Sequence, residues 1–411
     1  MKFFRKMTVQ MRTYICAIVC SALGLGLSDQ VFANFFKDAY QVTTIQRSVI
    51  EGPRELPGIL CVFITAALSF LGDGTIIIFA QLLMFIGITV LGLVTPPFGV
   101  MLVFLFINSL GMHIAMPLQD SIGMSLAEPD RVGTRMGQYN GFRTAATMLI
   151  SLLVFIGFRA GFFTFETEIK PIFLIAAVLF AASFVCYCVL RRQTGAQSGR
   201  KRKVQLIFRK RYSIYYMLAA AHGVQKQIVF VFAPWILIEL MLRQADTTAI
   251  LAVCTSFLGI LFLPMVGRWM DRFGVKRLLY VETIGFVCIY LGYFFVSGGV
   301  ASGRLAITGL PLILACGLYI LDRMCSSLGM VRTVYLRSIT PDPAEVTPAL
   351  STGLSIDHVV SIVCAYLGGL VWTNWGPQYV FLIALALSAV NLFVIRLVKL
   401  PARQEADAAV Q

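Results

Sequence analysis

The chain has 411 residues, of which 58% are hydrophobic and only 13% are charged. Soluble domains carry about 25% charged residues, so this composition excludes an ordinary soluble protein and indicates an integral membrane protein. The formal net charge of +14 comes mainly from basic segments beside apolar stretches, a distribution that argues against a nucleic-acid-binding protein.

The apolar residues gather into twelve stretches, each long enough to cross a bilayer as a helix. The sequence lacks the alternating ten-residue pattern that is typical of an outer-membrane β-barrel. We therefore predict an all-α polytopic membrane protein with twelve transmembrane helices. The predicted spans cover residues 13–36, 55–72, 75–94, 97–124, 136–162, 170–190, 212–240, 247–267, 275–297, 305–337, 348–372 and 376–399.

The first predicted span begins like a signal peptide, with a basic head before an apolar run. It lacks a small-residue cleavage site and eleven further spans follow it, so we expect a retained helix. Asp29 lies in the outer half of this span, next to Gln30, and Gln30 shares a helix face with Asn34 four residues later. Polar groups inside a span usually face a cavity or a partner, which makes these three residues cavity candidates.

Two more ionisable groups lie inside spans of the first half. His113 is near the middle of the fourth span, and Arg143 lies about two turns into the fifth. Each has a structural alternative: His113 as a hydrogen-bonded core residue, and Arg143 as a gate partner of Asp130 and Arg135. We keep both residues as candidates for the cavity wall.

A basic linker separates six spans from the next six. Residues 191–213 hold nine Lys and Arg and no acid, a pattern typical of a cytoplasmic loop that also contacts anionic lipids. The predicted domains are an N-terminal bundle over 1–190, a linker over 191–211, a C-terminal bundle over 212–399 and a tail over 400–411.

The orientation follows from the same rule. The N-terminus, the linker, the loop 268–277 and the segment after the last span are all basic, and twelve spans place them on one side. We therefore expect both termini to be cytoplasmic and the protein to lie in the cell membrane.

The second half carries three pairs of ionisable residues inside spans. The pairs are His222 with Lys226 in the seventh span, Asp322 with Arg323 in the tenth, and Asp357 with His358 in the eleventh. We predict that they line the cavity, and the last two pairs have the alternative of structural bridges between helices. A faint repeat links the halves, because "SLGM" occurs at 109–112 and again at 327–330, each time in the fourth span of its half.

A short charged loop follows the eighth span. It reads Gly267-x-x-x-Asp271-Arg272-x-Gly274-x-Lys276-Arg277. We expect Gly267 to allow close helix packing and Gly274 to permit the chain reversal. Asp271 is expected to accept hydrogen bonds from the N-terminus of the next helix and to pair with a nearby Arg.

This loop resembles the signature G-x-x-x-D-R-x-G-x-x-[RK] of the major facilitator superfamily, and the resemblance extends to the twelve spans and the central basic linker. It implies two pseudo-symmetric six-helix bundles and a loop that acts as a conformational latch.

The sequence departs from the family pattern at two places. The matching loop of the first half, "SFLGDGTI", keeps Gly72 and Asp73 but lacks the basic residues, so we expect a latch in one half only. The fifth span lacks the glycine–proline pattern of drug–proton antiporters, which weighs against that class. The segment "EPDRVGTRMG", with Arg131, Gly133 and Arg135, resembles the family's Arg-Gly-rich loop.

Nothing in the sequence indicates an enzyme. G-x-S-x-G, H-E-x-x-H and phosphate-binding G-K-[ST] motifs are absent from the sequence, so we predict no catalytic residues and no cofactor. All ten cysteines fall in apolar stretches, where they usually behave as small hydrophobes, and we predict neither disulfides nor a metal site.

The sequence favours a secondary active transporter that moves a small solute by rocker-switch alternating access. Protons are a candidate coupling ion, carried by Asp29 or Asp357, and deep cations slightly outnumber deep acids, which favours an organic anion or zwitterion. One alternative is an exporter of amphipathic compounds or lipids. Another is a non-transporting sensor or scaffold on the same fold. We expect a monomer in contact with membrane lipids.

Overall fold

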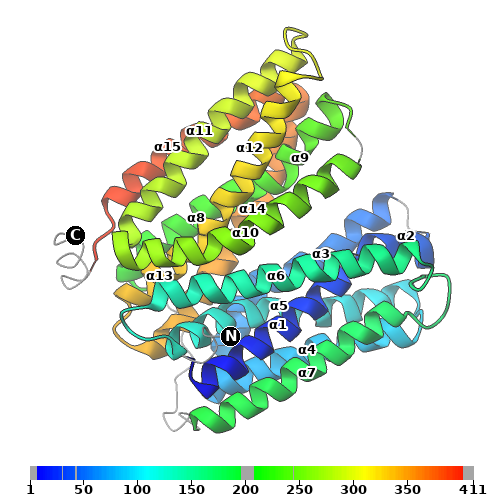
Figure 1. The fold of residues 1–411 in the computed structure, drawn as a ribbon, viewed down its shortest axis with the longest axis vertical. Coiled ribbons are helices and arrows are strands. Elements are labelled where there is room, and N and C mark those ends of the chain that lie inside the picture. Colours follow the sequence, from blue (N-terminus) through cyan, green and yellow to red (C-terminus); the bar gives the residue numbers. More distant parts are fainter. Residues whose placement is uncertain (1–6, 30, 42–43, 196–207, 244, 401–411) are drawn as a thin grey trace. The chain divides into compact units, whose positions relative to one another are not determined.

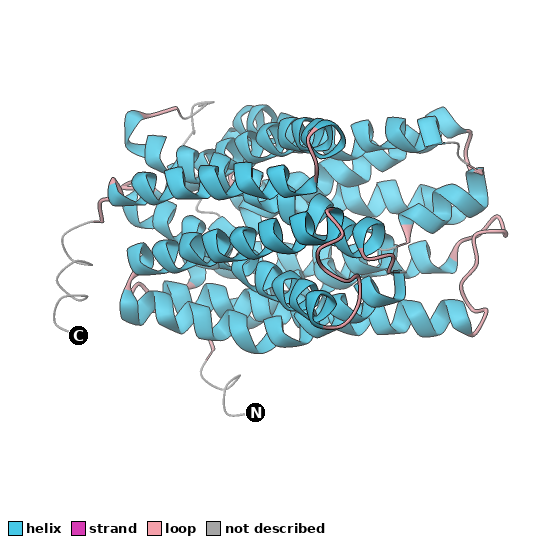
Figure 2. Ribbon diagram, turned by 90° about the horizontal axis from the view of Figure 1, so that it is seen from above, coloured by secondary structure: helices cyan, strands magenta, loops and turns pink. Residues whose placement is uncertain are grey.

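The computed structural model describes residues 7–29, 31–41, 44–195, 208–243 and 245–400. Within these ranges the regular structure is helical and no strand occurs (Figure 2). The α-helices are α1 (Val9–Asp29), α2 (Phe32–Tyr40), α3 (Thr44–Leu68), α4 (Asp73–Leu93), α5 (Phe98–Leu126), α6 (Val132–Arg159), α7 (Pro171–Thr194), α8 (Ser213–Gln227), α9 (Ala233–Trp235), α10 (Ala245–Phe273), α11 (Val275–Ala301), α12 (Leu310–Ser326), α13 (Met330–Ile339), α14 (Val346–Asn374) and α15 (Pro377–Arg396). Short 3-10 segments are η2 (Ser69–Leu71), η3 (Lys210–Tyr212), η6 (Ser327–Gly329) and η7 (Pro343–Glu345), and η4 (Ile228–Phe232) and η5 (Ile236–Leu240) are π-helical.

Twelve helical stretches in the described part of the chain are long and apolar enough to cross a membrane. The all-α, twelve-span prediction is therefore confirmed. The first predicted span, 13–36, differs from the structure, because α1 ends at Asp29 and a separate helix, α2, begins at Phe32. The seventh span is interrupted by the two π-helical segments, which flank Pro234, a residue without a backbone donor.

The described helices divide into two compact units. Unit 1 contains residues up to 128 together with 142–207 and 343–355, and unit 2 contains 129–141, 208–342 and the residues from 356 onward. Both α6 and α14 cross this division, so their first turns belong to a different unit from the rest of the helix. The predicted linker falls largely on residues 196–207, outside the described residues, as does the predicted tail from 401 onward.

In unit 1, α7 packs against α1 and α4, and α5 packs against α3 and α4 (Figure 1). Polar side chains join the helices at buried points: Ser183 on α7 donates to the carbonyl of Ala17 at 2.9 Å, and Tyr14 on α1 donates to the carbonyl of Gln119 at 2.6 Å. Such bonds tie apolar helices together where the hydrophobic effect contributes little between them.

In unit 2, α11 packs against α15 and α12 around an aromatic core. The rings of Tyr293 and Phe381 stack 5.0 Å apart, and Phe286 stacks on Tyr290 at 5.6 Å. All four side chains are buried. Asn391 on α15 also donates to the Thr283 hydroxyl on α11 at 3.1 Å, so this part of unit 2 forms a rigid support for the charged residues beside it.

Candidate functional site

A small polar recess lies in unit 1, where α1, α3 and α5 meet. It is lined by Asp29, Phe32, Arg54, Glu55, Leu105, Asn108, Ser109 and Met112. Arg54 and Asp29 stand 4.0 Å apart, and their side chains are 26% and 40% exposed. Of the three candidates predicted in the first span, Asp29 thus lines a recess. Gln30 lies outside the described residues, and only the backbone of Asn34 is described.

His113 lies beside this recess and is buried. Its Nδ1 is 2.8 Å from the carbonyl oxygen of Ser109, one helical turn earlier, and the Ser109 hydroxyl donates to the carbonyl of Arg54 at 2.5 Å. Because a carbonyl only accepts, Nδ1 donates and, in the neutral ring, Nε2 keeps the lone pair. This bond is the one expected for a core histidine, and it also fixes the ring so that Nε2 can act as an acceptor.

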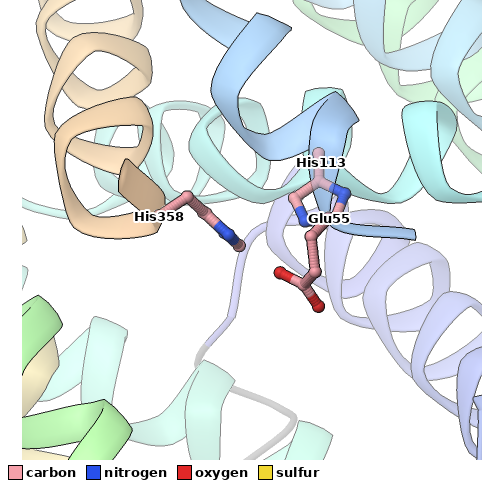
Figure 3. Close-up of side chains that lie close together, drawn as sticks. All are labelled: Glu55, His113 and His358. Atoms are coloured by element: carbon pink, nitrogen blue, oxygen red, sulfur yellow. The ribbon is translucent and has the colours of Figure 1, made fainter. Parts of the chain in front are cut away.

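Glu55 and His113, both in unit 1, present ligand-type atoms within 4.8 Å of one another (Figure 3). A carboxylate and an imidazole are usual ligands of transition metals, but metal sites in proteins normally use three or four protein ligands.

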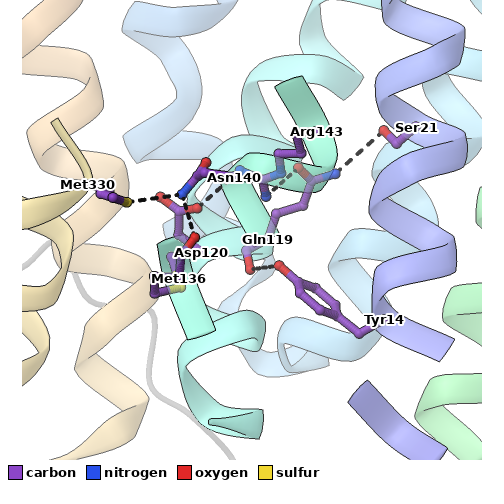
Figure 4. Close-up of polar contacts among 8 residues, drawn as sticks. All are labelled: Tyr14, Ser21, Gln119, Asp120, Met136, Asn140, Arg143 and Met330. Carbon is purple, nitrogen blue, oxygen red and sulfur yellow. Dashed lines mark hydrogen bonds and ion pairs between the residues drawn. The ribbon is translucent and has the colours of Figure 1, made fainter. Parts of the chain in front are cut away.

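Arg143 reaches toward α5 in unit 1. It lies 3.4 Å from Asp120 Oδ1 and donates to Gln119 Oε1 at 3.0 Å, and Gln119 in turn contacts Ser21 on α1 (Figure 4). The structure therefore gives Arg143 an acid and an amide as partners. Neither Asp120 nor Gln119 was singled out from the sequence, although a charge within an apolar span is a usable signal for Asp120.

Lys226 and Asp357 form an ion pair in unit 2, between α8 and α14. The Asp357 side chain is 9% exposed and that of Lys226 is 25% exposed. Gly223 makes the approach possible, since a Cβ there would come within 2.7 Å of the Asp357 carbonyl oxygen. A close helix crossing at Gly223 thus places the next turn of α8, which carries Lys226, against the carboxylate.

A second ion pair in unit 2 joins Arg332 on α13 to Glu282 on α11 at 2.6 Å, with side chains 8% and 2% exposed. His222 lies beside Arg332, because a Cβ on Gly329 would be 3.6 Å from the His222 ring and 2.9 Å from the Arg332 guanidinium. The sequence prediction missed Arg332 and Glu282. The available signal was the same one that selected Lys226, a charge within a predicted apolar span.

Asp322 and Arg323 are adjacent on α12 but point to different surroundings. The Arg323 guanidinium lies 4.3 Å over the ring of Phe230 and 5.2 Å over that of Tyr319. Asp322 is fully buried, and neither carboxylate oxygen has a hydrogen-bond partner among the described residues. His358, predicted beside Asp357, is buried in α14.

The charged loop predicted over 267–277 is helical at both ends, because α10 continues to Phe273, α11 begins at Val275 and only Gly274 reverses the chain. The α10 part of this segment contacts the beginning of α6, and both belong to unit 2. Asp271 accepts from the backbone N–H of Gly133 at 2.8 Å with one oxygen and from that of Thr134 at 2.7 Å with the other. First-turn N–H groups have no partner within their helix, and they carry the positive end of the helix dipole. The expected acceptor role is present, but the helix is α6 rather than the next helix, α11.

The glycines of this loop have distinct geometric roles. Gly267 touches the backbone of α6 at Gly133 and Gly137, and a Cβ on Gly137 would lie 2.5 Å from the Leu263 carbonyl oxygen. Gly274 adopts a φ of 81°, in the left-handed region, and precedes α11. The loop therefore allows α10 and α6 to meet at backbone contact.

The basic residues of the loop differ in their contacts. Lys276 donates to the carbonyls of Arg396 and Val398 at 3.2 and 2.8 Å, next to the C-terminal end of α15, where a cation is favourable. Arg272 lies 5.3 Å over the ring of Phe273. Arg277 is exposed.

The corresponding segment of the first half, "SFLGDGTI", also contacts the beginning of a helix through its aspartate. Asp73 Oδ2 accepts from the hydroxyl of Thr347, at the beginning of α14, at 2.6 Å and from that of Ser121 at 3.1 Å, all within unit 1. The loss of basic residues from "SFLGDGTI" thus leaves the acceptor role of the carboxylate in place.

A sequence profile described as the Major Facilitator Superfamily matches residues 14–321 of the chain. The chain belongs to the major facilitator superfamily. This family and its solved members indicate a multi-pass membrane transporter rather than an enzyme, as the sequence predicted.

Solved structures share the fold of this superfamily member. The fucose:proton symporter FucP of E. coli is 12% identical, with a TM-score of 0.71 over 96% of this chain and 99% of that one. The proton:xylose symporter XylE, bound to 6-bromo-6-deoxy-D-glucose, is 13% identical, with a TM-score of 0.69 over 95% of both chains. A bacterial homologue of the iron transporter ferroportin is 11% identical, with a TM-score of 0.71 over 95% and 99%. A search of curated proteins gave no match.

Proposed function

We propose that this protein is a secondary active transporter that moves a small polar solute by rocker-switch alternating access. The observation that carries the proposal is the set of charged side chains inside apolar helices, above all the Lys226–Asp357 and Arg332–Glu282 pairs. Each charge placed in a membrane costs at least about 2.5 kcal/mol on insertion scales, and such residues commonly mark solute or proton pathways.

The solute class follows from the recess in unit 1. Arg54 and Asp29 supply opposite charges there, and Asn108 and Ser109 add hydrogen-bonding groups. A site with both signs of charge suits a zwitterion or an organic anion. Protons are the proposed coupling ion, in line with the proton symporters that share the fold.

The proposed latch consists of two carboxylates that accept hydrogen bonds at helix starts. Asp271 of α10 accepts at the start of α6, and Asp73 of α4 accepts at the start of α14. These are the two helices that cross the division between the units. Alternating access needs contacts that break as helices change position, and carboxylates at helix ends supply contacts that can open without breaking a helix.

Two other functions are less well supported. An exporter of amphipathic compounds would need a mainly apolar cavity, whereas Asp29, Arg54, Glu55, Asn108 and Ser109 make five of the eight lining residues of the recess polar. A sensor on the same fold would have its charges paired off, whereas neither carboxylate oxygen of Asp322 has a hydrogen-bond partner among the described residues.

We further propose that the protein lies as a monomer in the cell membrane with both termini cytoplasmic, because basic segments flank both positions. Reporter fusions after Arg202 and at the C-terminus should both give cytoplasmic signals. An extracytoplasmic signal at either position would contradict this orientation.

The transport proposal is tested with purified protein. A solute panel is first screened by thermal stabilisation, and stabilising solutes are then assayed for uptake into proteoliposomes with and without a pH gradient. We expect at least one polar solute to accumulate only with the gradient. If a solute raises the Tm of the protein but is neither accumulated nor exchanged by it, the transport proposal is wrong.

A further inference from the structure

We propose that Asp322 is the carboxyl group that carries the coupling proton, and that Arg323 is the cation with which it pairs once the proton leaves. The assignment rests on the proposed function and names a residue for its coupling step. It departs from the sequence-based choice of Asp29 or Asp357.

The two earlier candidates each stand beside a cation. Asp357 is paired with Lys226, and Asp29 faces Arg54 at 4.0 Å. Each of these carboxylates already has a cationic partner, so neither matches the setting of an unpaired, buried acid.

Asp322 has the opposite environment. It is fully buried, and both of its oxygens lack a hydrogen-bond partner among the described residues. An isolated carboxylate in a low-dielectric interior is far more costly than the neutral acid, so burial of this kind selects the protonated form. The carboxyl group can therefore hold a proton without a dedicated partner.

The surroundings of Asp322 contain several groups that can respond to its charge. Tyr290 and Tyr293 of α11 interact electrostatically with Asp322, as do Arg323 and Cys325 of its own helix. Further away, Glu282 of α11 interacts with the same Tyr290 and Cys325. On the other elements that pack against α12, Glu239 of η5 and Arg268 of α10 are exposed. Arg323 is thus the cation that interacts electrostatically with Asp322.

Arg323 has a resting position that it can leave. Its guanidinium lies over the ring of Phe230, which is part of the π-helical segment η4, and over that of Tyr319 on its own helix. A cation–π contact of this kind stabilises the guanidinium less than a buried carboxylate would. Loss of the proton from Asp322 therefore draws Arg323 away from η4, and π-helical segments are frequent at functional sites.

The direct test is infrared spectroscopy of the full-length protein in lipid, titrated with pH. At neutral pH the wild type should show the carbonyl stretch of a protonated carboxylic acid, and the band should fade at alkaline pH. Asp322→Asn should lose it, and Glu239→Gln, which alters an exposed acid of the same unit, should keep it. Wild type without the band, or an Asp322→Asn protein that retains it, would overturn the assignment.

Two further measurements keep the test decisive. If Asp322→Asn does not fold, wild type made with ¹³C-labelled aspartate should show the band shifted, and an unshifted band would overturn the proposal. In proteoliposomes, Asp322→Asn should keep solute exchange but lose accumulation driven by a pH gradient, and a variant that still accumulates solute would overturn it. Because the infrared titration needs no solute, its failure is distinct from failure of the transport proposal.

Discussion

The ion pairs of unit 1 and unit 2 differ in burial and in geometry. In unit 1, Arg143 and Asp120 are 3.4 Å apart and Arg54 and Asp29 are 4.0 Å apart, with all four side chains between 24% and 40% exposed. In unit 2, Arg332 and Glu282 are 2.6 Å apart, with side chains 8% and 2% exposed. Partly exposed, loosely aligned pairs open at little cost, whereas a buried pair cannot lose one member without leaving a charge behind.

This difference indicates that the ion pairs of the two units have different roles. The loosely aligned pairs of unit 1 are suited to open when a solute binds, whereas the most buried pair of unit 2 tolerates substitution only when both charges change. The predictions below test this contrast, beginning with the largest expected effect.

Removing one member of the most buried pair should have the largest effect on stability. Glu282→Gln leaves the Arg332 guanidinium buried without its acid, which costs about 3–5 kcal/mol when a buried pair is broken. Thermal unfolding in detergent should show a clear fall in Tm, and the double variant with Arg332→Gln should recover most of it. A double variant as unstable as the single one would show that packing, rather than charge, is responsible.

Lys226→Ala should destabilise the protein less, because the Lys226 side chain is 25% exposed and its carboxylate partner can be partly hydrated. We expect a cost of about 1–3 kcal/mol for the Asp357 oxygen that loses its partner. Adding Asp357→Asn should restore Tm but not transport, since both residues are proposed to serve the solute pathway. Normal transport by Lys226→Ala would show that Lys226 serves packing only and does not line the solute pathway.

Arg143→Gln should cost about 1 kcal/mol or less, because a shorter amide side chain gives up an ion pair that is already partly exposed. Its hydrogen bond to Gln119 is lost as well. The loss of Tm in Arg143→Gln, compared with the loss in Glu282→Gln, measures the difference in stability between the ion pairs of the two units. A fall as large as that of the unit 2 variant would remove the proposed difference between the units.

Arg54→Gln should have the smallest effect on stability, within about 0–1 kcal/mol, since its pair with Asp29 is the most exposed. Solute binding should fall nevertheless, because Arg54 lines the recess. Thermal stabilisation by the solute found in the panel is the measurement. If the solute stabilises Arg54→Gln as much as the wild type, the solute does not bind in the recess that Arg54 lines.

The sequence was sufficient for the twelve spans and for the family, because both depend on local signals: apolar length and one charged loop. It could not give the partner of each charge. Asp271 contacts Gly133 and Thr134, which lie 138 and 137 positions earlier in the chain. Lys226 meets Asp357 because a glycine, Gly223, lets α8 approach α14.

The role of Asp322 illustrates a different limit. In the sequence, Asp322 and Arg323 are adjacent residues of opposite charge, and on that basis we treat them as one pair. Successive residues of a helix point about 100° apart, so neighbours in sequence need not be neighbours in space. Only the structure separates the buried acid from a guanidinium stacked on Phe230.

Hydrogen–deuterium exchange at the start of α6 tests most directly whether Asp271 holds this helix in a transporter that alternates between states. The amides of Gly133 and Thr134 lack partners in their own helix and donate to Asp271. Asp271→Asn should accelerate their exchange about 5–30-fold, which corresponds to a loss of one to two kcal/mol, while Asp73→Asn leaves these amides unchanged. Unchanged exchange of both amides in Asp271→Asn, measured in the same lipid, would contradict the latch.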